Sequence, residues 1–436
     1  MVFQKCSYPH SSKRASFDVY KEKLSKRWHR MNSRSLALGD VIVIDFGWIL
    51  AAPVTSKFLA DLGATVIRVE SVHKLDGIRT TPPFRDNRPG IDRSGYFAMY
   101  NPNKYSMALN LKHPKAVGVA KRLIAKSDVV IENFVPGAMK RLGLDYENLT
   151  KIKPDIIMLS LSMLGQTGPY AKHLGFGIQL TGLTGFTHIT GWPDRDPVQP
   201  YAGVTDACAP NLAAGAVIAA LIHRRKTGKG QYLDMSQNEA SIQYLSPLVL
   251  DYITSGRIAS KCGNNHAFAV PHGAFQCIGD DRWCTIAVFT DDEWKAFCKV
   301  LGDPEWAHNS KFSNFLERKK HEDELNLLIT EWTKQHTAEQ VMHLMQAAGV
   351  PAGVVLSPDN LLDDPQWKHR NFFWYLDHPE LGNYPHFGES FQLSRTPVAG
   401  RMPAPCFGQH TEKVCTEVIH MSDTEFAELL GEGVFE

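Results

Sequence analysis

The sequence lacks the closely spaced cysteines from which disulfide frameworks and zinc sites are built. Its eight cysteines are scattered over 436 residues, and none stands in a CxxC or paired Cys/His spacing. Structural zinc sites and disulfide-rich domains both use such recurring spacings. We therefore expect neither a bound metal nor a disulfide framework, and we expect the protein to work in a reducing cytoplasm.

The chain also lacks a large net charge of one sign. Its formal net charge is +1 at pH 7, so no global field gathers nucleic acid or an anionic membrane. The charge is uneven, because residues 1–36 hold nine basic and only two acidic side chains. This basic N-terminal extension has neither the apolar core of a secretory signal nor the acid-poor composition of a transit peptide. We expect this extension to be either an arm that packs against the protein or an overlong start of the sequence.

No apolar run is long enough to cross a bilayer. The longest one, Asn211 to Ile222, suits a buried helix instead. With 43% hydrophobic and 21% charged residues, the composition is that of an ordinary globular protein. A chain of this length exceeds the usual size of a single core, so two domains are expected.

Three familiar nucleotide and hydrolase motifs are missing. After Phe46 the chain reads Gly-Trp-Ile-Leu-Ala-Ala, without the glycine fingerprint that cradles a dinucleotide pyrophosphate. The basic turn at 224–230 lacks the spacing of a phosphate-binding loop and the Ser/Thr that follows its Lys. No GxSxG nucleophile elbow occurs. NAD, FAD and nucleoside triphosphates are thus disfavoured as ligands.

What is present is a repeated strand–helix–strand pattern. An apolar strand at 41–46, a helix at about 53–62 and a second strand at 65–70 form a βαβ unit. Strands ending at Glu132 and Ser160 repeat the pattern, and a further strand follows the apolar helix at 208–224. Strands that are apolar throughout are typical of a parallel sheet covered by helices on both faces.

The character of the chain changes after about residue 255. Residues 272–289 alternate around a Gly-Asp-Asp turn, which predicts a hairpin, and helices follow at about 291–301, 314–334 and 338–348. We expect 358–383 to be a loop-rich connector. The predicted domains are, in chain order, the extension 1–36, a large α/β domain 37–254, a small α+β domain 255–370, and a tail 371–436 that returns to the large domain.

Asp206 precedes the apolar helix. On local grounds it is a helix N-cap, because an Asp there accepts from free backbone amides and complements the helix dipole. Asn133 begins a turn at the carboxyl end of a strand, where parallel sheets bind ligands. Local spacing alone assigns neither residue a chemical role.

A series of ordered segments carries a family resemblance. They are DFGWILAAPVTSKFLADLGATVIRVE, NPNKYSMALNLKHP, VIENFVPGAMKRLGLDYENL, LGQTGPY, LTGLTGFTHITGWPD, TDACAPNLAAGAVIAAL, RRKTGKGQYLDMSQNEA, AGVPAG and GQHTEKV. Together they resemble the family III CoA-transferases, the group of formyl-CoA transferase and carnitine CoA-transferase, from about Gly39 to Gly433. Within that family, the sequence most resembles benzylsuccinate CoA-transferase-type subunits.

The resemblance implies a fold and a set of site residues. The fold is a Rossmann-like large domain plus a small domain, in an interlocked-ring dimer with the active site between domains. The family nucleophile falls on Asp206. Family positions that contact CoA fall on Ala51, Leu109, Lys112, Asn133, Phe134 and Arg141. Lys112 and Arg141 suit a ligand with several phosphate charges.

The resemblance also implies a reaction. Asp206 attacks the donor thioester to give a mixed anhydride, and the CoA thiolate then converts it to an aspartyl-CoA thioester. The acceptor carboxylate enters next and the steps run in reverse. Because one thioester is exchanged for another, no permanently bound cofactor and no metal is required, and acyl-CoA and a carboxylic acid are the substrates. Amides near the helix start could hold the oxyanion.

Four residues depart from the patterns of related enzymes. The racemases of the family carry a His-Asp pair where this chain has Phe176 and Gly177, so the base is missing. Formyl-CoA transferase has His and Gln where Trp48 and Leu50 stand here. Losing these polar groups disfavours formate and oxalate and indicates a larger acyl group, aromatic or branched.

Two alternatives to a self-sufficient CoA-transferase stay open. One is an acyl-CoA racemase or isomerase. The other is a CoA-binding partner subunit of a heteromeric CoA-transferase, which the changes at Trp48 and Leu50 favour and the retained Asp206 opposes. We expect a homodimer or a heteromer with a related subunit, and neither nucleic acid nor a membrane as a partner.

Overall fold

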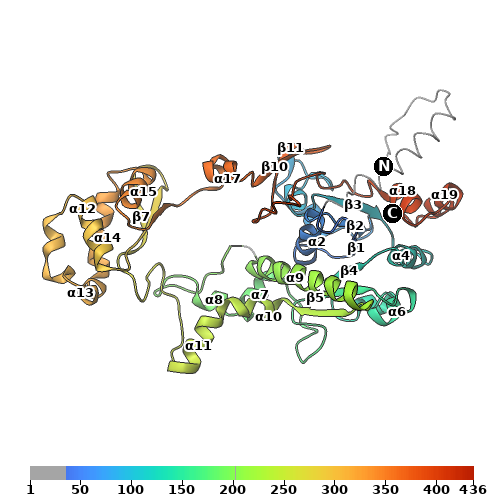
Figure 1. The fold of residues 1–436 in the computed structure, drawn as a ribbon, viewed down its shortest axis with the longest axis horizontal. Helices are drawn as coiled ribbons and strands as arrows, with labels where there is room; N and C mark the ends of the chain where they lie inside the picture. Colours follow the sequence, from blue (N-terminus) through green and yellow to red (C-terminus); the bar gives the residue numbers. More distant parts are fainter. Residues whose placement is uncertain (1–35, 202) are drawn as a thin grey trace. The chain divides into compact units, whose positions relative to one another are not determined.

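The computed structural model describes residues 36–201 and 203–436 (Figure 1). All but the last residue of the predicted basic extension therefore lies outside the described residues. The rest of the chain divides into two compact units. The larger unit comprises 36–180, 203–244 and 371–436, and the smaller one comprises 181–202 and 245–370.

A six-stranded sheet forms the centre of the larger unit. Its strands are β1 (Ile42–Asp45), β2 (Thr65–Glu70), β3 (Lys104–Ala108), β4 (Val129–Glu132), β5 (Ile157–Ser162) and β6 (Tyr232–Ser236). They lie in the order β3-β2-β1-β4-β5-β6, and every pair is parallel. The predicted α/β class with a parallel sheet is confirmed. The order reverses between β1 and β4, which is where such sheets bind ligands.

Strand β3 is the one strand of this sheet that the sequence pattern did not predict. It carries the polar side chains of Lys104 and Ser106, both buried. Lys104 Nζ donates to the Pro53 carbonyl oxygen at 2.7 Å and to Asn101 Oδ1 at 2.9 Å. A buried lysine with its own polar partners breaks the apolar pattern by which a buried strand is recognised.

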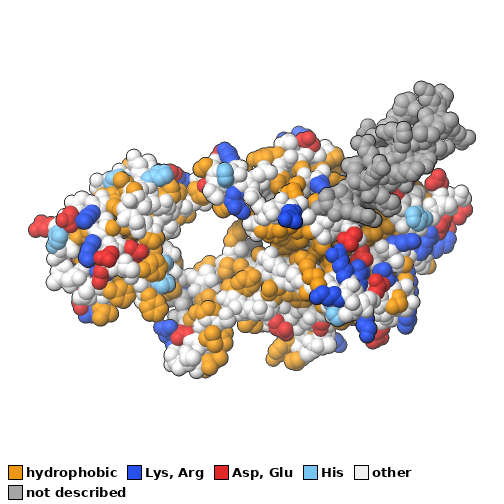
Figure 2. Space-filling model, viewed as in Figure 1, with side chains coloured by type: hydrophobic (Ala, Val, Ile, Leu, Met, Phe, Trp, Pro, Cys, Tyr) orange, Lys and Arg blue, Asp and Glu red, His pale blue; other side chains and the backbone are white. Residues whose placement is uncertain are grey.

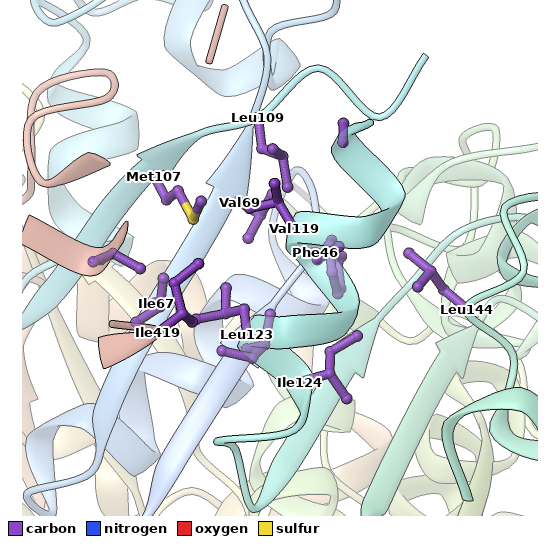
Figure 3. Packing of buried hydrophobic residues seen from close by; sticks show 14 of the residues in the cluster. Phe46, Ile67, Val69, Met107, Leu109, Val119, Leu123, Ile124, Leu144 and Ile419 are labelled. Atoms are coloured by element: carbon purple, nitrogen blue, oxygen red, sulfur yellow. The ribbon is translucent and has the colours of Figure 1, made fainter. Parts of the chain in front are cut away.

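Helices cover both faces of the sheet and give two separate cores. One core contains α2 (Ala51–Asp61), α9 (Val204–Thr227) and α10 (Gln237–Ile242). The other contains α4 (Ala116–Ile124), α6 (Tyr146–Ile152) and the C-terminal segment with α18 (Thr411–Lys413) and α19 (Asp423–Gly431). Figure 3 shows Ile419 of that segment beside Ile67 and Leu123.

Helix α9 differs from its prediction in its start and length. It begins at Val204, not near residue 208, and runs for 24 residues. Among the described helices it alone is long and apolar enough to span a membrane. Ala209, Ala213 and Val217 are fully buried against the sheet, however, and Arg224 pairs with Asp128 at 2.8 Å. These contacts are those of a core helix, as the apolar run predicted.

The smaller unit is built around a three-stranded antiparallel sheet of β7 (His272–Gln276), β8 (Trp283–Ala287) and β9 (Ala352–Val354). The predicted hairpin is confirmed. Helices α12 (Asp291–Val300), α13 (Phe315–Lys320), α14 (Glu322–Thr333) and α15 (Ala338–Ala347) belong to the same unit. Its core contains Phe297, Phe312, Leu325 and Ile329, all but completely buried.

The prediction that residues 358–383 form a loop-rich connector is wrong in part. It holds α16 (Pro358–Asp363), α17 (Pro365–His369) and β10 (Phe373–His378), which pairs with β11 (Gly382–Phe387). Pro358 and Pro365 begin the two helices, because the first helical position needs no backbone N–H. Prolines that mark loops elsewhere therefore start helices here.

A buried network of charges ties β2 to the loops beside it. Arg79 Nε and Nη2 donate to the two carboxylate oxygens of Glu70 at 3.0 and 2.9 Å, and Arg79 Nη1 donates to Asp92 at 2.8 Å. Arg68 pairs with Asp76 and, at 3.1 Å, with Glu70. The Arg68 and Arg79 guanidinium groups hold the pKa of Glu70 at about 2, although burial opposes this.

Removing Arg79 from this network should destabilise the larger unit. Arg79→Met leaves the buried Glu70 carboxylate with one cation fewer and should lower the free energy of unfolding by about 3 kcal/mol or more. The matched control is Arg225→Met, which breaks an exposed pair with Asp40 and should cost less than about 1 kcal/mol. Denaturant titration measures both, and equal losses would contradict the account.

Candidate active site

One cavity of about 900 Å³ opens at the carboxyl edge of the parallel sheet. Its walls include residues that follow the carboxyl ends of all six strands, because parallel strands end at the same edge. All eleven residues predicted from the sequence lie around it: Trp48, Leu50, Ala51, Leu109, Lys112, Asn133, Phe134, Arg141, Phe176, Gly177 and Asp206. They come from distant parts of the chain and all belong to the larger unit.

The loop between β1 and α2 is held in a defined shape. Asn133 Oδ1 accepts from the Trp48 N–H and Asn133 Nδ2 donates to the Trp48 carbonyl oxygen, each at 2.8 Å. Ile49 has φ +64°, which is rare for a β-branched residue and costs about 1–3 kcal/mol. Its N–H donates to the Asp76 carboxylate at 2.9 and 3.1 Å. The buried charge network thus fixes one wall of the cavity.

Two aromatic side chains, Trp48 and Phe134, pack together on that wall. The rings of Trp48 and Phe134 meet edge to face with their centroids 5.4 Å apart, and Lys74 Nζ lies 4.8 Å from the Trp48 ring centroid. The Phe134 N–H donates to Glu132 Oε2 at 2.7 Å. Burial raises the pKa of Glu132 to about 7, so this carboxyl group titrates near neutral pH.

Three basic side chains line the cavity, Lys74, Lys112 and Arg141, together with two histidines, His73 and His173. The three basic residues follow β2, β3 and β4, so they come from three different strand ends at the same edge of the sheet. Such a group suits phosphate oxygens, which accept charge-assisted hydrogen bonds. The sequence predicted Lys112 and Arg141 but not His73, Lys74 or His173, although His73 and Lys74 could have been found from their place just after β2.

Asp206 lies in the first turn of α9, and the N-cap role inferred from local sequence is wrong. The cap position is Gly203, whose carbonyl oxygen accepts from the Asp206 N–H at 2.8 Å. The Asp206 carboxylate instead accepts from Gln237 Nε2, which donates to Oδ1 at 2.8 Å. Gln237, the first residue after strand β6, takes the place of the backbone amides as a donor, because Asp206 lies inside the first turn and not at the cap position.

Two glycines pack against the other carboxylate oxygen. A Cβ atom built on Gly177 would stand 2.4 Å from Asp206 Oδ2, and one built on Gly203 would stand 2.5 Å from it. Any larger residue at either position would have to displace the carboxylate. Position 177 therefore cannot hold a catalytic base while Asp206 keeps this conformation, which agrees with the argument against racemisation.

Burial raises the pKa of Asp206, and the hydrogen bond from Gln237 opposes that rise. A partly desolvated carboxylate with one donor is more nucleophilic than one solvated by water, and it faces the cavity. The arrangement can therefore attack an electrophilic carbon bound beside it.

Gln237 and Ser162 are cavity residues that the sequence reading missed. Gln237 is the first residue of α10, directly after β6, and Ser162 is the last residue of β5. Their positions at strand ends were a usable signal, but Ser and Gln are too common after strands to stand out without the geometry.

Comparison with known proteins places the chain in a family. Residues 38–411 match the model of CoA-transferase family III. The chain is 33% identical over 398 residues to succinyl-CoA:glutarate CoA-transferase of Homo sapiens, which covers 91% of this chain and 89% of that protein. It is 31% identical to succinate–glutarate CoA-transferase of Agrobacterium fabrum over 390 residues, 89% of this chain and 97% of that one.

A solved structure agrees with this. A CaiB/BaiF family protein from Brucella suis superposes with a TM-score of 0.80 at 30% identity, and the match covers 89% of this chain and all of that one. The predicted family and the predicted enzyme class are therefore confirmed: the chain belongs to CoA-transferase family III and is similar to enzymes that transfer CoA.

Proposed function

We propose that this enzyme transfers CoA from an acyl-CoA thioester to a carboxylic acid through a covalent intermediate on Asp206. The observation that carries the proposal is the half-buried Asp206 carboxylate, which lines the same cavity as Lys74, Lys112 and Arg141. The cations suit the phosphates of CoA, and the carboxylate is the nucleophile that the exchange of one thioester for another requires.

The steps balance without any further reagent. The Asp206 carboxylate attacks the thioester carbonyl carbon, the C–S bond breaks, and CoA leaves as a thiolate from a mixed anhydride. The thiolate then attacks the Asp206 carbonyl carbon and releases the donor acid. Aspartyl-CoA thioester remains. The acceptor carboxylate enters and the same steps run in reverse, so that Asp206 ends as a carboxylate.

The donor is a CoA thioester of a short dicarboxylic acid. Three relatives support this, since the names of the human, Agrobacterium and Chloroflexus aurantiacus enzymes all contain succinyl-CoA or succinate. The apolar faces of Trp48, Leu50 and Phe176 in the cavity are the basis for expecting a larger aromatic or branched group. A panel of succinyl-CoA, glutaryl-CoA and an arylacyl-CoA decides between them, and succinyl-CoA should have the highest kcat/KM.

The enzyme works as an oligomer of two chains in a reducing cytoplasm. Large apolar side chains stay exposed on α11 (Ser246–Ser255), among them Leu250, Tyr252 and Ile253 (Figure 2). Such a surface is expected to be covered by another chain. All seven cysteines among the described residues are free thiols, as a reducing compartment requires. One relative is named as a beta subunit, so a heteromer is the alternative.

Asp206→Asn should abolish CoA transfer, since an amide cannot form the anhydride, while CoA itself should still bind. Wild-type enzyme incubated with succinyl-CoA and then hydroxylamine should carry a hydroxamate on the peptide that contains Asp206, as mass spectrometry would detect. Asp155→Asn, which removes a partly exposed carboxylate outside the cavity, is the control and should keep full activity. Turnover by Asp206→Asn at more than about 1% of wild type would refute the proposal.

The cations that line the cavity should act on binding and not on chemistry. Lys112→Met and Arg141→Met should each raise KM for the acyl-CoA by about tenfold, change kcat by less than about threefold, and weaken the salt dependence of kcat/KM. Lys140→Met removes a neighbouring charge that does not line the cavity, and it should change neither constant. A loss confined to kcat in the first two variants would contradict a phosphate-binding role.

The pH profile should report the raised pKa of Asp206. Attack requires the ionised form, so kcat/KM should fall as the pH falls through that pKa. Because burial raises the pKa, the acidic limb should lie above the ordinary value of 3.8. A rate that stays constant down to pH 4 would show that no carboxylate with a raised pKa takes part.

A further inference from the structure

We propose that Gln237 and Ser162 are the hydrogen-bond donors that stabilise the two oxyanions of this reaction. The inference rests on the proposed role of Asp206. Gln237 donates a hydrogen bond to the oxygen on the enzyme side of the anhydride. Ser162 donates one to the carbonyl oxygen of the acyl group. Neither role follows from the match to the family.

Gln237 already occupies the position that the first role requires. Its Nε2 donates to Asp206 Oδ1 at 2.8 Å. When the CoA thiolate attacks the Asp206 carbonyl carbon, the negative charge of the tetrahedral intermediate develops on a carboxyl oxygen of this residue. A donor at hydrogen-bond distance before the reaction starts needs no reorganisation, and that is the condition for strong oxyanion stabilisation.

The Gln237 side chain is also held in place. Gln237 is 8% exposed, and it opens α10 directly after Ser236, whose hydroxyl caps the same helix by accepting from the Glu239 N–H at 3.2 Å. Helix α10 packs against α9, which carries Asp206. Donor and nucleophile therefore stand on adjoining helices of one core and keep their separation.

Ser162 is a buried hydroxyl that faces the same cavity. It is 5% exposed and lines the cavity, yet its Oγ has no hydrogen-bond partner among the described residues. A buried hydroxyl without a partner costs about 1–3 kcal/mol, so its retention at a cavity wall points to a ligand oxygen. In the sheet Ser162 is the register partner of Ser236, the residue before Gln237.

Three of the predicted pocket residues in the cavity wall offer no side-chain donor. Leu50 and Phe176 line the cavity with hydrocarbon, and Gly177 has no side chain. An acyl carbonyl oxygen that gains charge there needs a donor from another element. Ser162, at the end of β5, and Gln237, just after the end of neighbouring β6, supply a pair of donors on adjacent strands.

The test is a rapid-quench measurement of single turnovers with succinyl-CoA as the probe, in wild type and in Q237M and S162A. Mass spectrometry of the quenched protein separates the acyl adduct from the CoA adduct. Q237M should slow formation of the CoA adduct roughly 100-fold, and S162A should slow formation of the acyl adduct by a similar factor. The Kd for CoA should change less than about twofold in both.

S241A is the matched control. Ser241 Oγ is likewise buried without a partner among the described residues and lies on α10, but it does not line the cavity. Its removal should leave both rate constants at the wild-type value. A second readout separates catalysis from mere packing: without the bond from Gln237, the acidic limb of kcat/KM should move to higher pH in Q237M and stay in place in S162A.

Wild-type rate constants in Q237M and S162A would overturn this inference, as would an equal loss in S241A. The proposed function fails separately, through turnover by Asp206→Asn. If Asp206→Asn is inactive and both donor variants react at the wild-type rate, Asp206 remains the nucleophile and the donors lie elsewhere.

Discussion

All six strands of the central sheet run in one direction, and this common direction determines where the chemistry can lie. Every strand ends at the same edge, so segments more than a hundred residues apart in the chain, such as those of Trp48 and Gln237, meet at one cavity. The order reverses between β1 and β4, and the loops after these two strands are joined there by the two hydrogen bonds of Asn133 to Trp48. The geometry of the site follows from the topology of the sheet.

The charges buried beside the sheet make that edge rigid. Asp76 pairs with Arg68 and also accepts from the Ile49 N–H, so the network that bears on stability also holds the strained loop of the cavity. Burial of charge is costly, and pairing with groups of opposite charge is what makes it tolerable. The strain at Ile49 is a further cost, and we infer that it is retained because it sets the position of Trp48.

Most of the fold could be predicted from the sequence, because buried parallel strands are apolar throughout and their helices are amphipathic. Strand β3 was not predicted because Lys104 is buried with polar partners. The helices within 358–383 were not predicted because proline begins helices as well as loops. For the site, family resemblance supplied residues such as Lys112 and Asp206. It could not supply Gln237 or the contacts of Gly177 with Asp206, because those depend on how α7 (Gly177–Leu183), α9 and α10 meet in space.

The account depends most on the claim that Asp206 becomes covalently bonded during turnover. An acceptor acid labelled with oxygen-18 in its carboxylate tests this directly, since the proposed steps leave one acceptor oxygen on the nucleophile. After turnover, digestion and mass spectrometry should find the heavy isotope in the peptide that contains Asp206 and in no other. An unlabelled Asp206 in an enzyme that has converted the labelled acceptor to its CoA thioester would contradict the account.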